Sequence, residues 1–275
     1  VLALPLPNLR AYDPAFAYEL ATIVRDGIRR MYVDQENLFY YLTVLNEPYA
    51  MPAMPAGAEE GILRGLYLCR PAPALGAPAP GAALASGTRA SGTPTSASPS
   101  SAAPRVHLLG SGAILNEVLK AQDLLAERYG VAADVWSATS YKELYRDACE
   151  AQRWNLLHPE QPPRVPYVRQ VLAPTAAGAG APPRPVFVAA TDYLKALPEL
   201  VARWLPGPLL PLGTDGYGRS DGRAELRDFF EVDARYVALA ALHGLAQEGA
   251  LDAAVPRRAI RELEIDPDKL NPHIA

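Results

Sequence analysis

Residues 37–62 read NLFYYLTVLNEPYAMPAMPAGAEEGI, a strand-like run followed by an unusual proline- and methionine-rich segment. Residues 38–45 are almost continuously apolar and aromatic, and the run is too short for a buried helix. A run of this length and composition is typical of a strand that is covered on both faces of a sheet. The sequence therefore predicts a buried strand near the start of the chain.

A helix is predicted before this strand. Asp13 can act as the N-cap, and Pro14 supplies a fixed φ angle at the first helical position. Arg25, Arg29 and Arg30 lie near the predicted end, where cations interact favourably with the helix dipole. Apolar residues recur at three- and four-residue steps, which places them on one face: Phe16, Leu20, Ile23, Val24, Ile28 and Met31. One helix and one strand thus open the chain as the tail of a larger sheet domain.

From about residue 105 onward, strand and helix patterns alternate. The predicted strands span residues 106–109, 131–136, 186–190 and 209–212. The predicted helices span residues 114–129, 141–153, 234–246 and 255–263. Such alternation is typical of a parallel or mixed sheet with helices on both faces. The predicted fold class is α/β, with a three-layer α/β/α sheet domain in this part of the chain.

Two stretches, residues 71–104 and 174–185, consist mainly of Ala, Pro, Gly, Ser and Thr. Segments with so few large apolar side chains cannot bury enough surface to offset the entropy lost on ordering. The first is predicted to be a disordered linker, and about 34 flexible residues would span roughly 30 Å. The second is predicted to be a smaller insertion in a surface loop.

Composition narrows the class of protein. A chain of 275 residues with 49% hydrophobic content can bury the core of one or two domains. No run approaches the roughly 18 apolar residues of a membrane span, and residues 1–9 show no leader peptide, which favours a cytoplasmic location and no membrane partner. Cys69 and Cys149 offer neither a disulfide framework nor a metal spacing. The net charge of -4, with both signs interspersed, argues against a nucleic-acid partner.

Gly110-Ser111-Gly112 follows a predicted strand and opens a helix, where backbone N–H groups can bind a phosphate. A dinucleotide fingerprint requires a third glycine, but position 115 is Leu, and Asp134 is a poor match for the acidic residue of the second strand. A tight strand-to-helix turn is therefore the favoured interpretation. A small-ligand or nucleotide-binding module is the alternative.

The segment GTDGYGRSD at residues 213–221 is rich in glycine and acidic residues. A calcium loop is disfavoured, because Tyr217 and Arg219 stand where oxygen ligands are required. The favoured interpretation is a polar loop in which Ser220 or Asp221 caps the next helix. The alternative is a loop at an active-site cleft or a dimer contact, formed by Asp215, Tyr217, Arg219, Ser220 and Asp221.

The histidines at positions 107, 158, 243 and 273 have no carboxylate or nucleophile at a spacing that indicates catalysis. His107 lies inside an apolar strand and His158 precedes a proline-rich turn, so packing and turn hydrogen bonds account for both. Asp192 and Asp233 are predicted to be ordinary helix caps. No nucleophile elbow, zinc pair or phosphate-binding Walker loop is found.

A set of motifs occurs in one order along the chain and resembles the homodimeric pyruvate dehydrogenase family. This is the acetyl-transferring component of the 2-oxoacid dehydrogenase complex, in the transketolase-like superfamily. The motifs are MPAMPAGAEEGI at 51–62, VHLLGSGAIL at 106–115, RWNLLHP at 153–159, RVPY at 164–167, ATDY at 190–193, GTDGYGRSD at 213–221 and DKLNP at 268–272. The resemblance covers most of the chain outside the two low-complexity stretches.

The resemblance implies a division of the chain. Residues 1–69 would end a middle, pyrimidine-binding-type domain, and residues 70–104 would form the disordered linker. Residues 105–275 would form a transketolase C-terminal-like domain with a loop insertion at 173–185. Because the chain starts at Val1 without Met, it is expected to be the carboxyl-terminal fragment of a longer enzyme.

The resemblance also implies a function. The family decarboxylates pyruvate with thiamine diphosphate and Mg²⁺, and reductively acetylates the lipoyl group of dihydrolipoyl acetyltransferase. In this sequence Thr214 replaces the first Gly of the Gly-Asp-Gly coenzyme signature, and the next Asn after Asp215 is the distant Asn271. The family's activating glutamate and its active-site histidine cluster match no stretch, and the latter would lie upstream of Val1. The chain alone is therefore expected to be inactive and to bind no coenzyme.

Its expected partners are the rest of its own chain, the second subunit of a homodimer and the acetyltransferase. The expected role is structural, at the coenzyme cleft and the dimer contact. A non-catalytic interaction domain of the same complex is the alternative. Asp13 resembles the Pro-Ala-Asp position at which related transketolases meet the sugar, although here the residues are Tyr12-Asp13-Pro14 and a cap is favoured.

Overall fold

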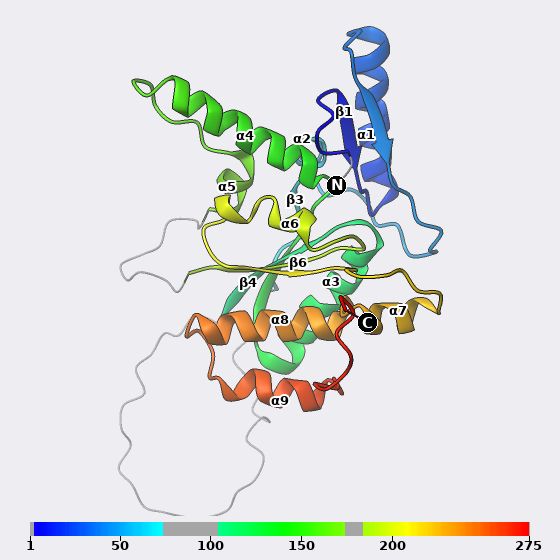
Figure 1. Cartoon of the computed structure of the whole chain (residues 1–275), viewed down its shortest axis with the longest axis vertical. Coiled ribbons are helices and arrows are strands. Elements are labelled where there is room, and N and C mark those ends of the chain that lie inside the picture. The colour runs from blue at the N-terminus through cyan, green and yellow to red at the C-terminus, as the bar shows by residue number, and fades with distance from the viewer. Residues whose placement is uncertain (1–2, 74–103, 174–183, 275) are drawn as a thin grey trace, which may run out of the picture.

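The computed structural model describes residues 3–73, 104–173 and 184–274, so most of both low-complexity stretches lies outside the described residues. The described residues form two sheets with flanking helices (Figure 1). The strands are β1 (Leu9–Tyr12), β2 (Phe39–Leu42), β3 (Tyr67–Arg70), β4 (Arg105–Gly110), β5 (Ala132–Ser137), β6 (Val186–Ala190) and β7 (Leu209–Leu212). The α-helices are α1 (Ala17–Ile28), α2 (Glu59–Arg64), α3 (Leu115–Leu124), α4 (Tyr141–Leu157), α5 (Tyr167–Leu172), α6 (Ala196–Glu199), α7 (Arg223–Phe229), α8 (Ala234–Gln247) and α9 (Ala254–Glu262).

The larger sheet has five strands in the order β3-β5-β4-β6-β7. Strands β5, β4, β6 and β7 run parallel, and β3 pairs antiparallel with β5 at the edge. Helices α3 and α8 cover one face, with α9 packed against α8, and α4, α5 and α6 lie on the other face (Figure 1). The predicted three-layer α/β/α class and the mixed sheet are therefore confirmed.

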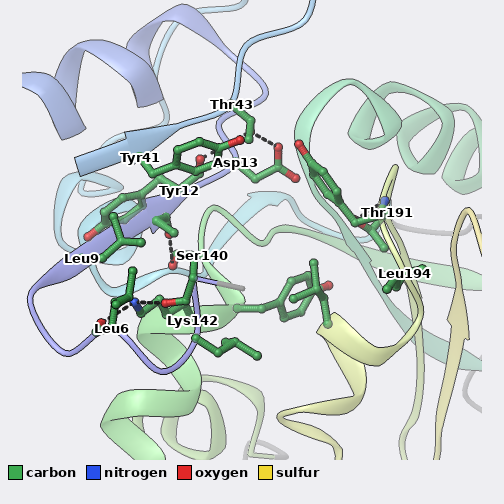
Figure 2. A pocket seen from close by; sticks show the side chains of 16 residues that line it. Leu6, Leu9, Tyr12, Asp13, Tyr41, Thr43, Ser140, Lys142, Thr191 and Leu194 are labelled. Carbon is green, nitrogen blue, oxygen red and sulfur yellow. Dashed lines mark hydrogen bonds between the residues drawn. The ribbon is translucent and has the colours of Figure 1, made fainter. Parts of the chain in front are cut away.

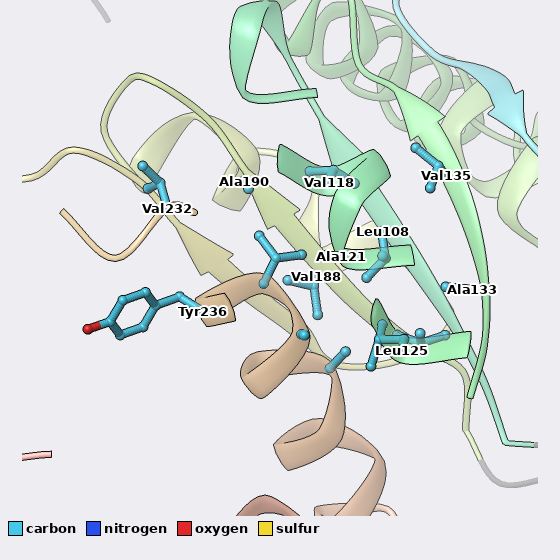
Figure 3. Packing of buried hydrophobic residues seen from close by; sticks show 14 of the residues in the cluster. Leu108, Val118, Ala121, Leu125, Ala133, Val135, Val188, Ala190, Val232 and Tyr236 are labelled. Carbon is cyan, nitrogen blue, oxygen red and sulfur yellow. The ribbon is translucent and has the colours of Figure 1, made fainter. Parts of the chain in front are cut away.

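The two faces of this sheet are built by alternating side chains of the central strands. Val106 and Leu108 of β4 pack under α3 and α8, together with Val188 of β6 (Figure 3). Leu109 and Phe187 point to the opposite face, under α4 and α5. Successive strand residues point to opposite sides, so a continuous apolar run fills both cores.

The smaller sheet pairs β1 and β2 in parallel, and it corrects one expectation. Strand β2 was predicted to be covered on both faces. In the structure Tyr40 and Leu42 pack beside the buried cluster under α1, whereas Phe39 and Tyr41 are 47% and 58% exposed. Within the described ranges β2 pairs only with β1, and one side of β2 is left exposed at Phe39 and Tyr41.

The start of α1 also differs from the prediction. Asp13 is not its N-cap, because the helix begins at Ala17 with Phe16 in the N-cap position. The Asp13 N–H donates to Thr139 O at 2.7 Å, and the Asp13 carbonyl accepts from Gly112 N at 3.1 Å. These long-range backbone bonds keep the chain extended here and delay the helix. The strands β1 and β3 and the helices α2, α5 and α6 were not predicted. Strand β3 joins the larger sheet, and it runs from the predicted 1–69 segment into Arg70, the first residue of the predicted linker.

Glu19 in the first turn of α1 connects this helix with the larger sheet. Its side chain is fully buried, and it accepts hydrogen bonds from the backbone N–H groups of Ala15 and Phe16. It also accepts from the Tyr67 hydroxyl of β3 at 2.6 Å and from Ser137 Oγ of β5 at 2.7 Å. Burial raises the pKa of Glu19, while these four donors oppose that rise. One carboxyl group therefore fixes α1 against the larger sheet.

Asp134 of β5 anchors both sides of the long low-complexity stretch. Its carboxylate accepts from the Ala72 N–H at 2.8 Å and from Arg105 Nε at 2.9 Å. Burial alone would raise the pKa of Asp134, but the Arg105 and Ala72 hydrogen bonds and the Arg105 charge outweigh it and lower the pKa. The carboxylate thus holds Ala72, near the start of the stretch, and Arg105, directly after its end, close to one strand.

Glu19→Ala is expected to lower the free energy of unfolding by about 3 kcal/mol or more, because four buried donors lose their acceptor. Glu19→Gln should cost roughly half as much, since its carbonyl oxygen can still accept. Urea unfolding followed by circular dichroism measures both. Glu60→Ala, at an exposed residue paired only with Arg64, is the control and should change stability by less than about 0.5 kcal/mol. An equal loss in Glu19→Ala and Glu60→Ala would contradict the bridging role.

Asp134 should make stability depend on pH. Its pKa in the folded state lies below the unfolded value of about 3.9. Its contribution is therefore fully present above that value and is lost as the pH falls through the lower folded-state pKa. Asp134→Asn should lower the free energy of unfolding by about 1–2 kcal/mol at neutral pH, and the difference from the unsubstituted chain should shrink as the pH falls below about 4. Asp123→Asn, at an exposed pair with Arg70, is the control in the same urea titrations. A difference that stays constant down to low pH would be the contrary result.

Candidate functional site

A cavity of about 590 Å³ lies where the β1–β2 sheet meets the larger sheet (Figure 2). We call it the junction cavity. Its walls come from the segment around β1, from Tyr41 and Thr43 at the end of β2, from the first turn of α4 and from the segment that follows β6. Ligands of open α/β sheets bind beyond the carboxyl ends of the strands. The junction cavity has this position relative to β5 and β6.

Asp13 is the one residue of the predicted site that lines the junction cavity. Its carboxylate accepts a hydrogen bond from Thr43 Oγ1 (Figure 2). Burial raises the pKa of Asp13, the hydrogen bonds from Thr43 and Ser111 lower it, and the charge of Asp192 raises it. The net direction is upward, so this carboxyl is more readily neutral than an exposed one.

Tyr141, which the sequence analysis did not single out, also lines the junction cavity. It is 6% exposed, and its hydroxyl has no hydrogen-bond partner among the described residues. Burial, followed by the nearby Asp13 charge, raises its pKa. The signal that could have located it is the Ser140-x-x-Glu143 pattern, in which Ser140 Oγ accepts from the Glu143 N–H at 3.0 Å. That pattern starts α4 and places Tyr141 in the first turn, facing the strand ends.

Lys142 follows Tyr141, and its ammonium group is hydrogen-bonded to backbone carbonyls. Its ammonium group donates to the carbonyls of Ala3 and Leu6, the latter at 2.7 Å (Figure 2). Burial lowers the pKa of Lys142. One residue further, Glu143 forms an ion pair with Arg10 of β1 at 3.0 Å. The first turn of α4 therefore holds the β1 segment through Lys142 and Glu143. The Lys142 ammonium group is used in these contacts and is not a free cation in the cavity.

The Gly110-Ser111-Gly112 segment forms a tight strand-to-helix turn, which is the favoured interpretation of the sequence. Gly112 has a φ of +51°, and a Cβ atom there would lie 3.0 Å from the Asp13 carboxylate. Its N–H donates to the Asp13 carbonyl, and the Ser111 N–H donates to Ala190 O at 3.3 Å. Ser111 Oγ is bonded to Thr191 Oγ1 at 2.9 Å. Donors that could bind a phosphate are thus already used by the chain itself.

The loop at 213–221 does not line the junction cavity. Asp215 accepts from the Lys195 N–H at 3.1 Å, next to the cavity-lining Leu194. Tyr217 is 84% exposed, and the Arg219 guanidinium lies 4.3 Å from the centre of the Phe229 ring. The structure therefore separates these residues from Asp13. Their place at a cleft or a dimer contact stays a prediction.

Besides Asp13, the predicted caps are confirmed in one case and wrong in two. Asp233 caps α8 by accepting from the N–H groups of Arg235 and Tyr236. Neither Ser220 nor Asp221 caps α7, because Gly222 is its N-cap and Asp221 bonds only to the adjacent Gly222 N–H. Asp192 begins no helix, since the next one starts at Ala196 with Lys195 as N-cap. Asp221 and Asp192 each lie one or more residues before the N-cap position of the helix that follows.

Two observations concern a site for magnesium and a diphosphate. In residues 3–73, 104–173 and 184–274, no group of three or more His, Cys, Asp or Glu residues is placed to hold a metal ion. The glycine turn described above has its N–H groups bonded to backbone carbonyls. The same parts of the chain contain no helix that is long and apolar enough to cross a bilayer.

The described fold, a five-stranded mixed sheet between two helix layers beside a small parallel sheet, is similar to that of solved transketolases. The family described as "Transketolase-like TK C-terminal domain" matches residues 95–233, about half of the chain. A solved transketolase from Pichia stipitis has a TM-score of 0.52 at 14% identity, and the match covers 90% of this chain and 26% of that chain. This likeness concerns the fold alone. The chain belongs to the transketolase-like family.

Within that family the chain is similar to pyruvate dehydrogenase, and the predicted resemblance is confirmed. "Pyruvate dehydrogenase E1 component middle domain" matches residues 1–52. The pyruvate dehydrogenase E1 component of Escherichia coli is 45% identical over 277 residues, which is 100% of this chain and 27% of that protein. The protein of the same name from Mycolicibacterium smegmatis is 41% identical over 268 residues, which is 97% of this chain and 25% of that protein. The chain thus spans about a quarter of the length of these curated relatives.

Gly112→Ala tests the turn. The substitution should lower the free energy of unfolding by about 2 kcal/mol, because a left-handed backbone costs an alanine about 1 kcal/mol and the new methyl group also crowds Asp13. Gly130→Ala is the matched control, since Gly130 has a φ of +62° and open space around its Cβ position. It should cost only the backbone part. Equal losses in urea unfolding of the two variants would show that the Asp13 contact is unimportant.

Proposed function

We propose that this chain is part of a cytoplasmic pyruvate dehydrogenase E1 component. In the full-length enzyme, pyruvate would be decarboxylated with thiamine diphosphate and Mg²⁺, and the lipoyl group of a dihydrolipoyl acetyltransferase would be reductively acetylated. The observation that carries the proposal is the 45% identity to the Escherichia coli protein along the whole chain. The order of the two family matches, middle domain first and C-terminal domain second, supports it.

We infer that the part of the enzyme spanned by this chain shapes the coenzyme cleft without holding the coenzyme. Support comes from the Gly112 N–H, which binds the Asp13 carbonyl, and from Asp215, whose carboxylate accepts the Lys195 N–H. Both groups are used within the chain. The division into an end of a middle domain at 1–69 and a C-terminal domain at 105–275 is part of this proposal, with β3 as a strand that the first part contributes to the second.

A contact role in a homodimer, or against the rest of the same protein, completes the proposal. Support comes from the exposed apolar side chains of β2 and the segment after it: Phe39, Tyr41, Val44, Leu45 and Met51. Contiguous exposed apolar side chains are typical of surfaces that become buried on assembly. Phe39 and Tyr41 belong to the small sheet, and Tyr41 also lines the junction cavity.

Thermal unfolding with and without the coenzyme tests whether this chain shapes the cleft without binding the coenzyme. Thiamine diphosphate with Mg²⁺ should leave the melting temperature of the purified 275-residue chain unchanged, because a ligand stabilises only a protein that binds it. The full-length protein should show a dose-dependent rise and should release CO₂ from pyruvate. A rise for the chain alone would refute the structural role, and a full-length protein that neither binds the coenzyme nor decarboxylates pyruvate would refute the enzyme assignment.

A further inference from the structure

His107 of β4 lies in a cluster of polar and aromatic side chains that the proposed function does not use. Its ring stacks on Phe187 of β6, with the ring centres 5.0 Å apart and the ring planes inclined by 14°. On its other side β5 places Asp134 and Trp136, because His107 and Asp134 are partners in the strand register and residues 134 and 136 point to the same face. The His107 side chain is only 18% exposed. A charge that appears on this ring is therefore poorly screened by water.

One hydrogen bond fixes the protonation state of the ring. The Trp136 indole Nε1–H donates to His107 Nδ1 at 3.2 Å. An indole N–H can only donate, so Nδ1 carries no proton while this bond exists, and the proton of the neutral ring is on Nε2. The Trp136 bond therefore belongs to the neutral form of His107 alone.

A second partner for the same nitrogen lies beside it. Asp134 Oδ2 is 3.7 Å from His107 Nδ1, so a small movement of the ring would bring the two atoms within hydrogen-bond distance. When Nδ1 takes up a proton from the solvent it becomes a donor, and a carboxylate is the strongest acceptor for it. The same Oδ2 accepts from Arg105 Nε at 2.9 Å, and Oδ1 accepts from the Ala72 N–H at 2.8 Å. Protonated His107 and Arg105 would thus compete for one oxygen atom.

The charges around His107 act in opposite directions. Among the described residues the ring is affected by the charges of Asp134 and Arg105, and its neighbours Trp136 and Phe187 are uncharged. Burial lowers the pKa of His107 below its ordinary value of 6.5, Asp134 raises it, and Arg105 lowers it. The net direction is downward, so the ring is neutral at neutral pH. Because the unfolded chain binds this proton first, the folded chain loses stability as the pH falls from 6.5 to the lower folded-state pKa.

We propose that His107 is a pH-sensitive switch with two hydrogen-bonded states. In the neutral state Nδ1 accepts from the Trp136 indole. In the protonated state Nδ1 donates to Asp134, the indole is released, and the bond between Asp134 and Arg105 weakens. The switch couples the acidity of the solvent to an indole ring in the core and to the first residue of the central strand β4. It does not depend on the proposed enzymatic function, since it rests only on contacts among β4, β5 and β6.

Nuclear magnetic resonance of the purified 275-residue chain tests the switch. The Trp136 indole N–H resonance, assigned by its loss in Trp136→Phe, should follow one titration curve with a midpoint below pH 6.5 while circular dichroism shows a folded chain. At about pH 7.5, where the ring is neutral, nitrogen-15 shifts should place the His107 proton on Nε2. His107→Asn keeps an acceptor near the Nδ1 position but cannot be protonated, so its Trp136 resonance should not depend on pH.

Two substitutions should move the midpoint in opposite directions. Asp134→Asn removes the carboxylate that favours the protonated ring and should lower the midpoint by about one pH unit. Arg105→Gln removes the competing cation and should raise it. His158→Asn is the control, because His158 also stacks on an indole, that of Trp154, with ring centres 4.5 Å apart, but its Nδ1 contacts the Trp154 carbonyl. This variant should leave the Trp136 curve unchanged.

The switch is refuted if the Trp136 resonance does not titrate before the chain unfolds in acid, or if the neutral His107 ring carries its proton on Nδ1. It is also refuted if His107→Asn keeps the titration curve of the unsubstituted chain. A shift of the midpoint in the same direction in Asp134→Asn and Arg105→Gln would show that these two groups do not compete for the ring in the proposed way, and would overturn it as well.

Discussion

The buried carboxyl group of Glu19 is the interaction on which the arrangement of the two sheets depends. It belongs to the first turn of α1, yet two of its four hydrogen-bond donors are side chains of the larger sheet, Tyr67 and Ser137. A carboxyl group without water is stable only when its oxygens are hydrogen-bonded. Any movement of α1 away from the large sheet would therefore leave this group without the Tyr67 and Ser137 donors, which makes the position of α1 a specific one.

The junction determines where the cavity is and why its wall is mixed. Because Asp13 is bound through its backbone to Thr139 and Gly112, the end of β1 is held against the ends of β4 and β5. The Arg10–Glu143 ion pair attaches β1 to α4 in the same region. These contacts bring aliphatic side chains of the β1 segment opposite the start of α4. The cavity between them is bounded by both surfaces, and neither surface encloses it alone.

The central part of the fold could be predicted from sequence because its signals are local. Strands β4 and β6 are apolar runs between turn residues, and Gly130 ends the helical segment after α3 in a left-handed conformation. Strand β3 gives no such signal, since its four residues become a strand only by pairing with β5, far along the chain. At α1 the local Asp13-Pro14 start signal is overridden by hydrogen bonds to residues about a hundred positions away. Pairing between residues that are far apart in the sequence cannot be predicted from local periodicity.

The same distinction explains why the sequence identified Asp13 but not Tyr141. It also explains why the loop at 213–221 has more weight as a candidate site in the sequence than the structure supports. An aromatic residue in a first helical turn is usually core, and only the three-dimensional surroundings reveal whether its hydroxyl has a partner. In the loop, by contrast, conspicuous residues such as Asp215 and Arg219 are used by near neighbours in space. Tyr41 on the open face of β2 also lines the junction cavity. A polypeptide that covered Tyr41 would therefore alter one wall of the cavity.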